Sequence, residues 1–328
     1  MDSFLFAVGA IAPIILMTAI GYFLKKVGFI TENLAKALNK LVFRVFLPAM
    51  LFLNVYKIEQ MGEWNLGYIG YVLLIEILVF FIAIPLVMIV TKKGERRGAL
   101  LQASFRSNYA LIGIPLAGSL FGDEGLIVAT LLSAAVIPLY NVLAVISLSV
   151  FSNEGKKPSA KKIILDILKN PLIISIASGV LALFCRLAFV NMDISFRLSD
   201  ITPLFTVLGY LSGLATPLAL LVLGAQFTFS AVASLKREII FGTLMRTVAV
   251  PVLGIGIALI FFGNRFHGAH FASFVAVFAT PVAVSSVPMA QEMKGDVTLA
   301  GQLVIWTTIA SAFSVFLASM VLRSAGIF

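Results

Sequence analysis

The sequence predicts an all-α integral membrane protein of ten transmembrane helices, built as two inverted five-helix repeats with broken crossing helices 4 and 9. Three observations support this prediction. The 328-residue chain is 60% hydrophobic and 12% charged, with a mean hydropathy of +1.07, whereas soluble domains carry about 25% charged residues. Ten apolar stretches are each about long enough to span a bilayer. Proline and glycine positions in the first half of the chain recur in the second half.

The predicted spans are helices, because a chain inside lipid must satisfy its backbone hydrogen bonds internally and no strand-like alternation is visible. The first apolar stretch has no basic residue before it and is followed by Lys25 and Lys26, which is the reverse of a signal peptide. We therefore expect it to remain as a span. The ten predicted spans are residues 4–24, 38–56, 66–91, 99–121, 125–151, 163–187, 202–227, 237–262, 270–292 and 297–322.

Basic residues gather in alternate loops between these spans. Because cytoplasmic loops carry the excess of lysine and arginine, the pattern predicts a multi-pass protein of the cell inner (plasma) membrane with both termini outside. The dispersal over short loops argues against nucleic acid as a partner, although the net charge is +9. With one cysteine and two histidines, the sequence suggests no disulfide framework, and we expect no metal and no cofactor. The basic loop residues are Lys25, Lys26, Lys36, Lys92, Lys93, Arg96, Arg97, Lys156, Lys157, Lys161, Lys162, Lys236, Arg237 and Lys294.

Loop 152–162, which we predict to be a cytoplasmic linker, divides the chain into a first repeat, residues 1–151, and a second, residues 163–328. Five spans in each half place the two halves in opposite orientations. Landmark prolines and glycines occur in the same order in both halves, which supports a duplication. The matched landmarks are Pro13 and Gly21 with Pro171 and Gly179, Pro48 with Pro217, and Pro115 and Gly122 with Pro288 and Gly295.

Spans 4 and 9 are both interrupted near their middle, by Gly113 and Pro115 in the first and by Pro281 and Pro288 in the second. Equivalent broken spans in two halves are typical of a secondary-transporter site. Proline is tolerated at the start of a helix, so Pro115 would begin the outer half of span 4 and Pro281 or Pro288 the inner half of span 9. Both new helix N-termini would offer N–H groups and a positive dipole end to an anion. The alternative is that these prolines only kink packed helices.

Three segments also carry a resemblance to a known family. In these segments and in its ten-span layout, the whole chain resembles the auxin efflux carrier family in its short bacterial form. The segments are Ser104-Phe-Arg-Ser-Asn108-Tyr-Ala-Leu-Ile-Gly-Ile-Pro115 with Leu120-Phe-Gly122-Asp-Glu-Gly125, Ile137-Pro-Leu-Tyr-Asn141-Val-Leu-Ala-Val, and Ala279-Thr-Pro-Val-Ala-Val284 with Ala290-Gln.

The resemblance implies a scaffold of spans 1, 2, 6 and 7 and a moving, elevator-type transport domain of spans 3–5 and 8–10. It also implies a homodimer and small organic anions as substrates, either malonate-like or malate-like carboxylates or auxin-like acids. The long cytoplasmic loop of plant members has no counterpart in the short loop 152–162, so control by phosphorylation of that loop is not implied.

Polar residues near the two breaks are the candidates for contact with a bound anion. Asn108 lies seven residues before Pro115 and corresponds to Pro281 in the other half, and its amide could cap a broken helix or bond a carboxylate. Serine and threonine could line the same site, although they also bond helix backbone in membranes. The predicted substrate-binding residues are Asn108, Ser107, Gly113, Pro115, Thr280, Pro281, Ser285, Ser286 and Pro288, with Asn54 and Gln226 from the facing spans 2 and 7.

Three charged residues lie well inside predicted spans, where charges are costly and usually functional. Arg106 could attract the anion or could snorkel to the cytoplasmic surface. Glu76 and Arg246 occupy repeat-equivalent spans 3 and 8, so we expect them to form an ion pair, with proton coupling at Glu76 as the alternative.

These features predict a secondary transporter, an efflux carrier of small organic anions in the lipid bilayer, coupled to H⁺ or to the membrane potential. One alternative is a sodium-coupled organic-anion symporter resembling the bile-acid sodium symporters. No acidic residue lies between Asn108 and Pro115 or between Pro281 and Pro288, which counts against a dedicated Na⁺ site. A second alternative is a non-transporting membrane sensor. A membrane enzyme is disfavoured because a His-Glu-x-x-His motif is absent and both histidines lie in a predicted loop or at its edge.

Overall fold

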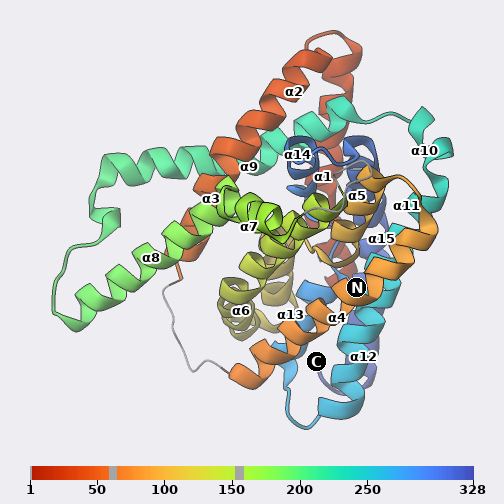
Figure 1. Cartoon of the computed structure of the whole chain (residues 1–328). Coiled ribbons are helices and arrows are strands. Elements are labelled where there is room, and N and C mark those ends of the chain that lie inside the picture. The colour runs from red at the N-terminus through yellow and green to blue at the C-terminus, as the bar shows by residue number, and fades with distance from the viewer. Residues whose placement is uncertain (1, 59–64, 152–158) are drawn as a thin grey trace.

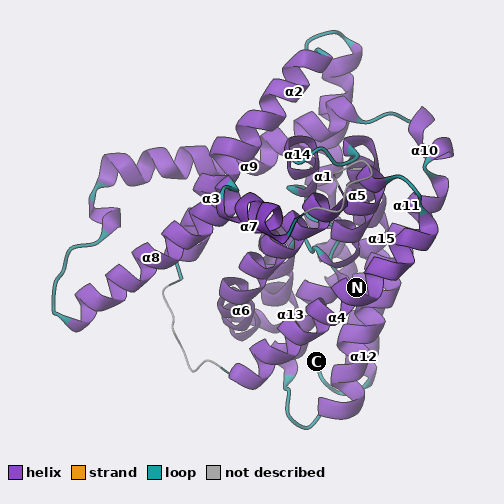
Figure 2. Cartoon of the chain, viewed as in Figure 1, coloured by secondary structure: helices purple, strands orange, loops and turns teal. Residues whose placement is uncertain are grey.

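The chain is all-helical in a computed structural model that describes residues 2–58, 65–151 and 159–328. Figure 2 shows helices joined by loops, and the described residues contain no strand. The α-helices are α1 Asp2–Lys26, α2 Glu32–Leu41, α3 Leu47–Tyr56, α4 Leu66–Val90, α5 Gly94–Phe105, α6 Ile114–Phe151, α7 Ala160–Leu168, α8 Pro171–Asn191, α9 Thr202–Gln226, α10 Ser230–Ser234, α11 Lys236–Leu244, α12 Val250–Phe262, α13 Gly268–Phe274, α14 Ser286–Glu292 and α15 Val297–Ser324.

Seven helices in the described part of the chain are long and apolar enough to cross a membrane, so the molecule is a multi-pass membrane protein. Three of them join several elements: α2 continues through α3 and α11 through α12, each as one rod, and residues 109–113 continue into α6. The seven are Glu32–Tyr56, Leu66–Val90, Tyr109–Phe151, Pro171–Asn191, Thr202–Gln226, Lys236–Phe262 and Val297–Ser324. The count of ten spans and their inverted repeat stay predictions, and residues 152–158 of the predicted linker lie outside the described residues.

The predicted start of span 6 at residue 163 is wrong. The structure has two helices here, because α7 ends at Leu168 and α8 begins at Pro171. Asn170 accepts a hydrogen bond from the N–H of Leu172, and proline favours the first position of a helix, so the chain starts a new helix at this point. The apolar residues 163–168 therefore belong to a separate short helix.

Four π-helical segments interrupt the rods, and each ends two residues before a proline. A proline ring clashes with the carbonyl four residues earlier in an α-helix, and a π-turn moves that carbonyl by bonding five residues back. The backbone N–H of Ile114, for example, donates to the carbonyl of Tyr109. The segments are η1 Val42–Phe46, η2 Tyr109–Gly113, η4 Met245–Ala249 and η5 Val275–Ala279, and the prolines are Pro48, Pro115, Pro251 and Pro281.

The helices pack as two groups (Figure 1). In the first group α1 packs on α9, and α3 packs on both α8 and α9. In the second group α6 packs on α5 and α13, while α15 packs on α5, α11 and α14. The groups meet where α1 contacts α15, α6 contacts α8, and α14 contacts α2. The expected separation of spans 1, 2, 6 and 7 from the other spans stays a prediction, because α1 also packs on α15.

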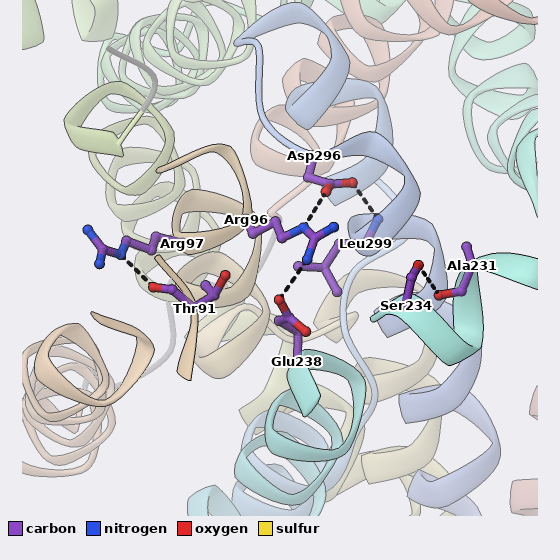
Figure 3. Close-up of polar contacts among 8 residues, drawn as sticks. All are labelled: Thr91, Arg96, Arg97, Ala231, Ser234, Glu238, Asp296 and Leu299. Atoms are coloured by element: carbon purple, nitrogen blue, oxygen red, sulfur yellow. Dashed lines mark hydrogen bonds and ion pairs between the residues drawn. The ribbon is translucent and has the colours of Figure 1, made fainter. Parts of the chain in front are cut away.

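Loops that follow alternate predicted spans contact one another. Arg96, at the start of α5, lies 3.0 Å from Glu238 of α11 and 3.3 Å from Asp296, which caps α15 (Figure 3). The side-chain amide of Gln291 donates to the carbonyl of Lys36. These contacts join the loops after predicted spans 3 and 9 to the start of predicted span 8, and the end of span 9 to the loop after span 1. The orientation of this face in a membrane stays a prediction.

Candidate functional site

The two predicted interruptions meet and cross. Helix α5 ends at Phe105, and the chain is extended until η2 begins at Tyr109. In the second half η5 ends at Ala279, and α14 begins at Ser286. The extended residues Ser107 and Val282 form an antiparallel bridge.

Two backbone hydrogen bonds hold this crossing. The N–H of Asn108 donates to the carbonyl of Pro281 at 2.8 Å, and the N–H of Ala283 donates to the carbonyl of Arg106 at 3.2 Å. The predicted correspondence between Asn108 and Pro281 is therefore a direct contact. Each break satisfies backbone groups that the other break exposes.

The first break lies earlier in the chain than predicted. Pro115 does not begin the second half-helix, because the helix starts at Tyr109 and the π-turn of η2 accommodates the proline ring. Pro115 lies instead in a groove with Leu111 and Pro217. Gly113 lies where η2 approaches η5, and a Cβ atom there would lie 2.8 Å from the carbonyl oxygen of Ala276. Its role is close backbone packing, not contact with a ligand.

The second break has a short continuation. Pro281 is extended and does not start a helix, whereas Pro288 is the third residue of α14, in its first turn as the other predicted possibility required. Pro288 is buried and does not line the cavity described next. Helix α14 has seven residues, so its dipole is smaller than that of the helix that runs from Tyr109 to the kink at Phe121 and Gly122.

A cavity of about 180 Å³ lies beside the crossing, at the junction of the two helix groups. No acidic side chain is among its lining residues. Five predicted residues line it: Asn54, Arg106, Ser107, Asn108 and Ser285. The other polar lining residues are Tyr109, Tyr140, Asn141 and Thr216, which the sequence analysis did not place in the site.

Arg106 is the only cationic side chain among the residues that line this cavity. It is 3% exposed, so it does not snorkel to the surface. Its guanidinium donates to Asn141 Oδ1 and Ser285 Oγ, each at 3.0 Å, and lies 2.9 Å from Met289 Sδ. None of these partners is charged. A buried arginine held only by neutral groups lacks the compensation that a carboxylate provides.

Asn108 also lines the cavity, and its side-chain amide nitrogen is buried. It is 8% exposed, and its Nδ2 atom has no partner among the described residues. The carbonyl of Asn108 accepts from the N–H groups of Ile112 and Gly113 and so begins the helix. An unpaired buried amide is costly, so a bound acceptor would satisfy it.

The missed residue Asn141 has a dual role. Its Nδ2 donates to the carbonyl of Ile137, next to Pro138 inside α6, while its Oδ1 accepts from Arg106. The sequence signal was an asparagine three residues after a proline inside an apolar helix. That pattern is typical of a side chain that bonds the helix backbone, and it does not indicate a contact with Arg106.

Three other predicted residues do not line the cavity. Thr280 donates to the carbonyl of Ala276 and shares a hydrogen bond with Ser107. Ser286 is 1% exposed and its hydroxyl has no partner among the described residues. Gln226 lies elsewhere: it is the last residue of α9 and bonds Asn39 and Gln291. Gln226 lies nine residues after Pro217, so its side chain lies beyond the crossing.

The predicted ion pair between Glu76 and Arg246 is wrong. No ion pair joins them among the described residues. Arg246 donates to three backbone carbonyls, and Glu76 accepts a hydrogen bond from Tyr140 at 2.7 Å. Both side chains are fully buried. The backbone carbonyls freed at the breaks compete for the guanidinium, and a sequence does not show where those carbonyls point.

Comparisons with known proteins identify a family and relatives that are described as transporters. The family described as "Membrane transport protein" matches residues 6–319. An uncharacterized transporter from Methanothermobacter thermautotrophicus is 24% identical over 328 residues, which covers 95% of this chain and 97% of the relative. Another from Methanocaldococcus jannaschii is 28% identical over 239 residues, with coverages of 70% and 71%. The uncharacterized transporter YfdV of Escherichia coli is 25% identical over 302 residues, with coverages of 88% and 89%.

Proposed function

The chain belongs to the membrane transport protein family, and we propose that it is a secondary transporter, an efflux carrier of small organic anions that bind beside the crossing. This family is the auxin efflux carrier family that the sequence resembles, so that prediction is confirmed. The prediction of a transporter and not an enzyme is also confirmed. The anionic substrate, the coupling and the mechanism form the proposal.

The observation that carries the proposal is the state of Arg106. A buried guanidinium faces a small cavity with only neutral partners and no carboxylate in the lining. An entering carboxylate would bond a charged donor, which is stronger than a neutral hydrogen bond. Asn108 also lines the cavity, and the helix that begins at Tyr109 has N–H groups at its start that are further donors. Malonate-like, malate-like or auxin-like acids fit this chemistry.

The position of the cavity supports alternating access. The lining includes residues of α3 and α9 from the first helix group. It also includes residues of the first break, of α6 and of the segment before α14, which belong to the second group. A movement of one helix group past the other would carry the anion with Arg106. We propose an elevator of this type, in a homodimer in the cell inner membrane with both termini outside, driven by H⁺ or by the membrane potential.

A reconstituted flux assay tests the proposal. Uptake of radiolabelled malonate, malate and indole-acetate into proteoliposomes is measured with an imposed membrane potential, a pH gradient or a Na⁺ gradient in turn. We expect saturable flux that Arg106→Gln removes. Arg265→Gln, which deletes an exposed loop arginine, is the matched charge-loss control and should keep the flux.

Each rival function has its own result in this assay. Flux that requires a Na⁺ gradient would favour the sodium-coupled symporter. No flux of any carboxylate in a folded sample would contradict the proposal and would favour a membrane sensor.

A further inference from the structure

Arg246 lies at the crossing but is not among the residues that line the cavity. It belongs to η4, in the rod formed by α11 and α12, and its exposed fraction is 0%. Its Nε donates to the carbonyl of Thr280 at 2.9 Å and its Nη1 to the carbonyl of Phe105 at 2.8 Å. Its Nη2 donates to the carbonyl of Val277.

These three carbonyls come from the C-terminal ends of both interrupted helices. Phe105 is the last residue of α5, Val277 lies in the last segment before the second break, and Thr280 caps that segment. Carbonyls at a helix end have no intrahelical donor, and the helix dipole is negative there. Two such ends that face each other inside a membrane require a positive charge.

In many secondary transporters, half-helix C-terminal ends and unwound carbonyls bind a Na⁺ or H⁺ that exchanges with solution. We propose that in this protein the guanidinium of Arg246 permanently occupies that position, as a cation built into the chain. Its planar fork matches three carbonyls at once, which a lysine ammonium cannot do equally well. The crossing therefore stays closed without an inorganic cation.

The packing of η4 fits this role. The rod that carries Arg246 contacts α5, α15 and η5, which all belong to the second helix group. The cation and both helix ends therefore belong to one unit and would move together. The guanidinium of Arg246 donates hydrogen bonds to these three carbonyls, and no ion pair joins it to Glu76 among the described residues.

Thermal unfolding of the purified full chain tests the inference without any transport assay. We expect the Tm of the wild type to be unchanged when Na⁺ is replaced by choline at constant ionic strength. Arg246→Ala should lower the Tm by about 5–10 °C, and millimolar guanidinium should raise it again in a saturable way. Arg246→Met is the matched control, because its side chain fills the space and should prevent the rescue.

A third variant keeps the test decisive if Arg246→Ala does not fold. Arg246→Lys retains the charge and should have a higher Tm than Arg246→Met. The inference is overturned if lysine is no better than methionine, if guanidinium fails to rescue folded Arg246→Ala, or if Na⁺ stabilises the wild type in a saturable way. The link to coupling rests on the proposed function, but absence of carboxylate flux would leave these Tm shifts unchanged.

Discussion

Two buried arginines, Arg106 and Arg246, lie at the crossing, and their partners differ. Arg246 donates to three backbone carbonyls from two helix ends, whereas Arg106 has only side-chain partners, one of them a thioether sulfur. Carbonyls at a fixed break cannot turn away, but the side chains around Arg106 can rearrange. The difference teaches that an intramembrane arginine is structural or ligand-binding according to its partners, and that depth alone does not decide.

The largest expected effect concerns Arg246 and the backbone carbonyls that accept its hydrogen bonds. Arg246→Gln should lower the free energy of unfolding by about 3–5 kcal/mol, because it leaves several buried carbonyls without a charged donor. Unfolding in denaturant, followed by tryptophan fluorescence or circular dichroism, measures this loss. Arg106→Gln should cost clearly less in the same assay. Equal losses at both positions would break the comparison.

The second effect concerns Arg106, which lines the cavity. Arg106→Gln should reduce the kcat/KM of anion transport by about 10- to 150-fold, since a hydrogen bond to a charged group contributes about 1.5–3 kcal/mol. The measurement is initial flux in proteoliposomes as a function of substrate concentration. Arg106→Lys should recover part of the loss. Full activity in Arg106→Gln would remove Arg106 from the site.

A third prediction examines how tightly the segments on the two sides of the crossing pack at Gly113. Gly113→Ala should destabilise the protein by about 1–3 kcal/mol, because the new Cβ would collide with the Ala276 carbonyl oxygen at 2.8 Å. Gly256→Ala is a suitable control, since nothing lies within 4 Å of a Cβ at that helical position. Thermal unfolding of both variants separates local collision from a general effect of alanine. A tolerated Gly113→Ala would mean that the two breaks can move apart.

The smallest effect concerns Asn108. Its Nδ2 has no protein partner, so Asn108→Ala should change stability little while raising the substrate Kd by about 2- to 12-fold, the equivalent of one neutral hydrogen bond. Equilibrium binding of radiolabelled anion to purified protein provides the measurement. A large loss of stability with unchanged binding would assign Asn108 to helix capping alone.

Much of this organisation could be predicted from residue order. The matched prolines located both breaks, and the correspondence of Asn108 with Pro281 is a backbone hydrogen bond in the structure. The apolar stretches located the helices because lipid leaves the backbone few other solutions. Local patterns of this kind report what a segment does by itself.

The remaining features depend on three-dimensional arrangement. The helix that follows the first break begins at Tyr109 and not at Pro115, because a π-turn accommodates a proline that would otherwise break an α-helix. Arg246 bonds carbonyls that become available only when both breaks meet. Gln226 turns away from the crossing toward residues distant in sequence. Hydropathy and spacing contain no information on these long-range partners.

The contact between α14 and the first helix group has a consequence for movement. Asn39 donates to both Gln226 and Gln291, and Gln226 also donates to Gln291, so three neutral amides join α2, α9 and α14. Water can replace each of these bonds at a cost of about 1 kcal/mol. Nearby, Arg44 of η1 pairs with Glu292 at 3.0 Å, but the arginine side chain is 59% exposed and the pair is weak. The contacts between α14 and the first helix group can therefore break and re-form without leaving an unpaired charge in the hydrocarbon.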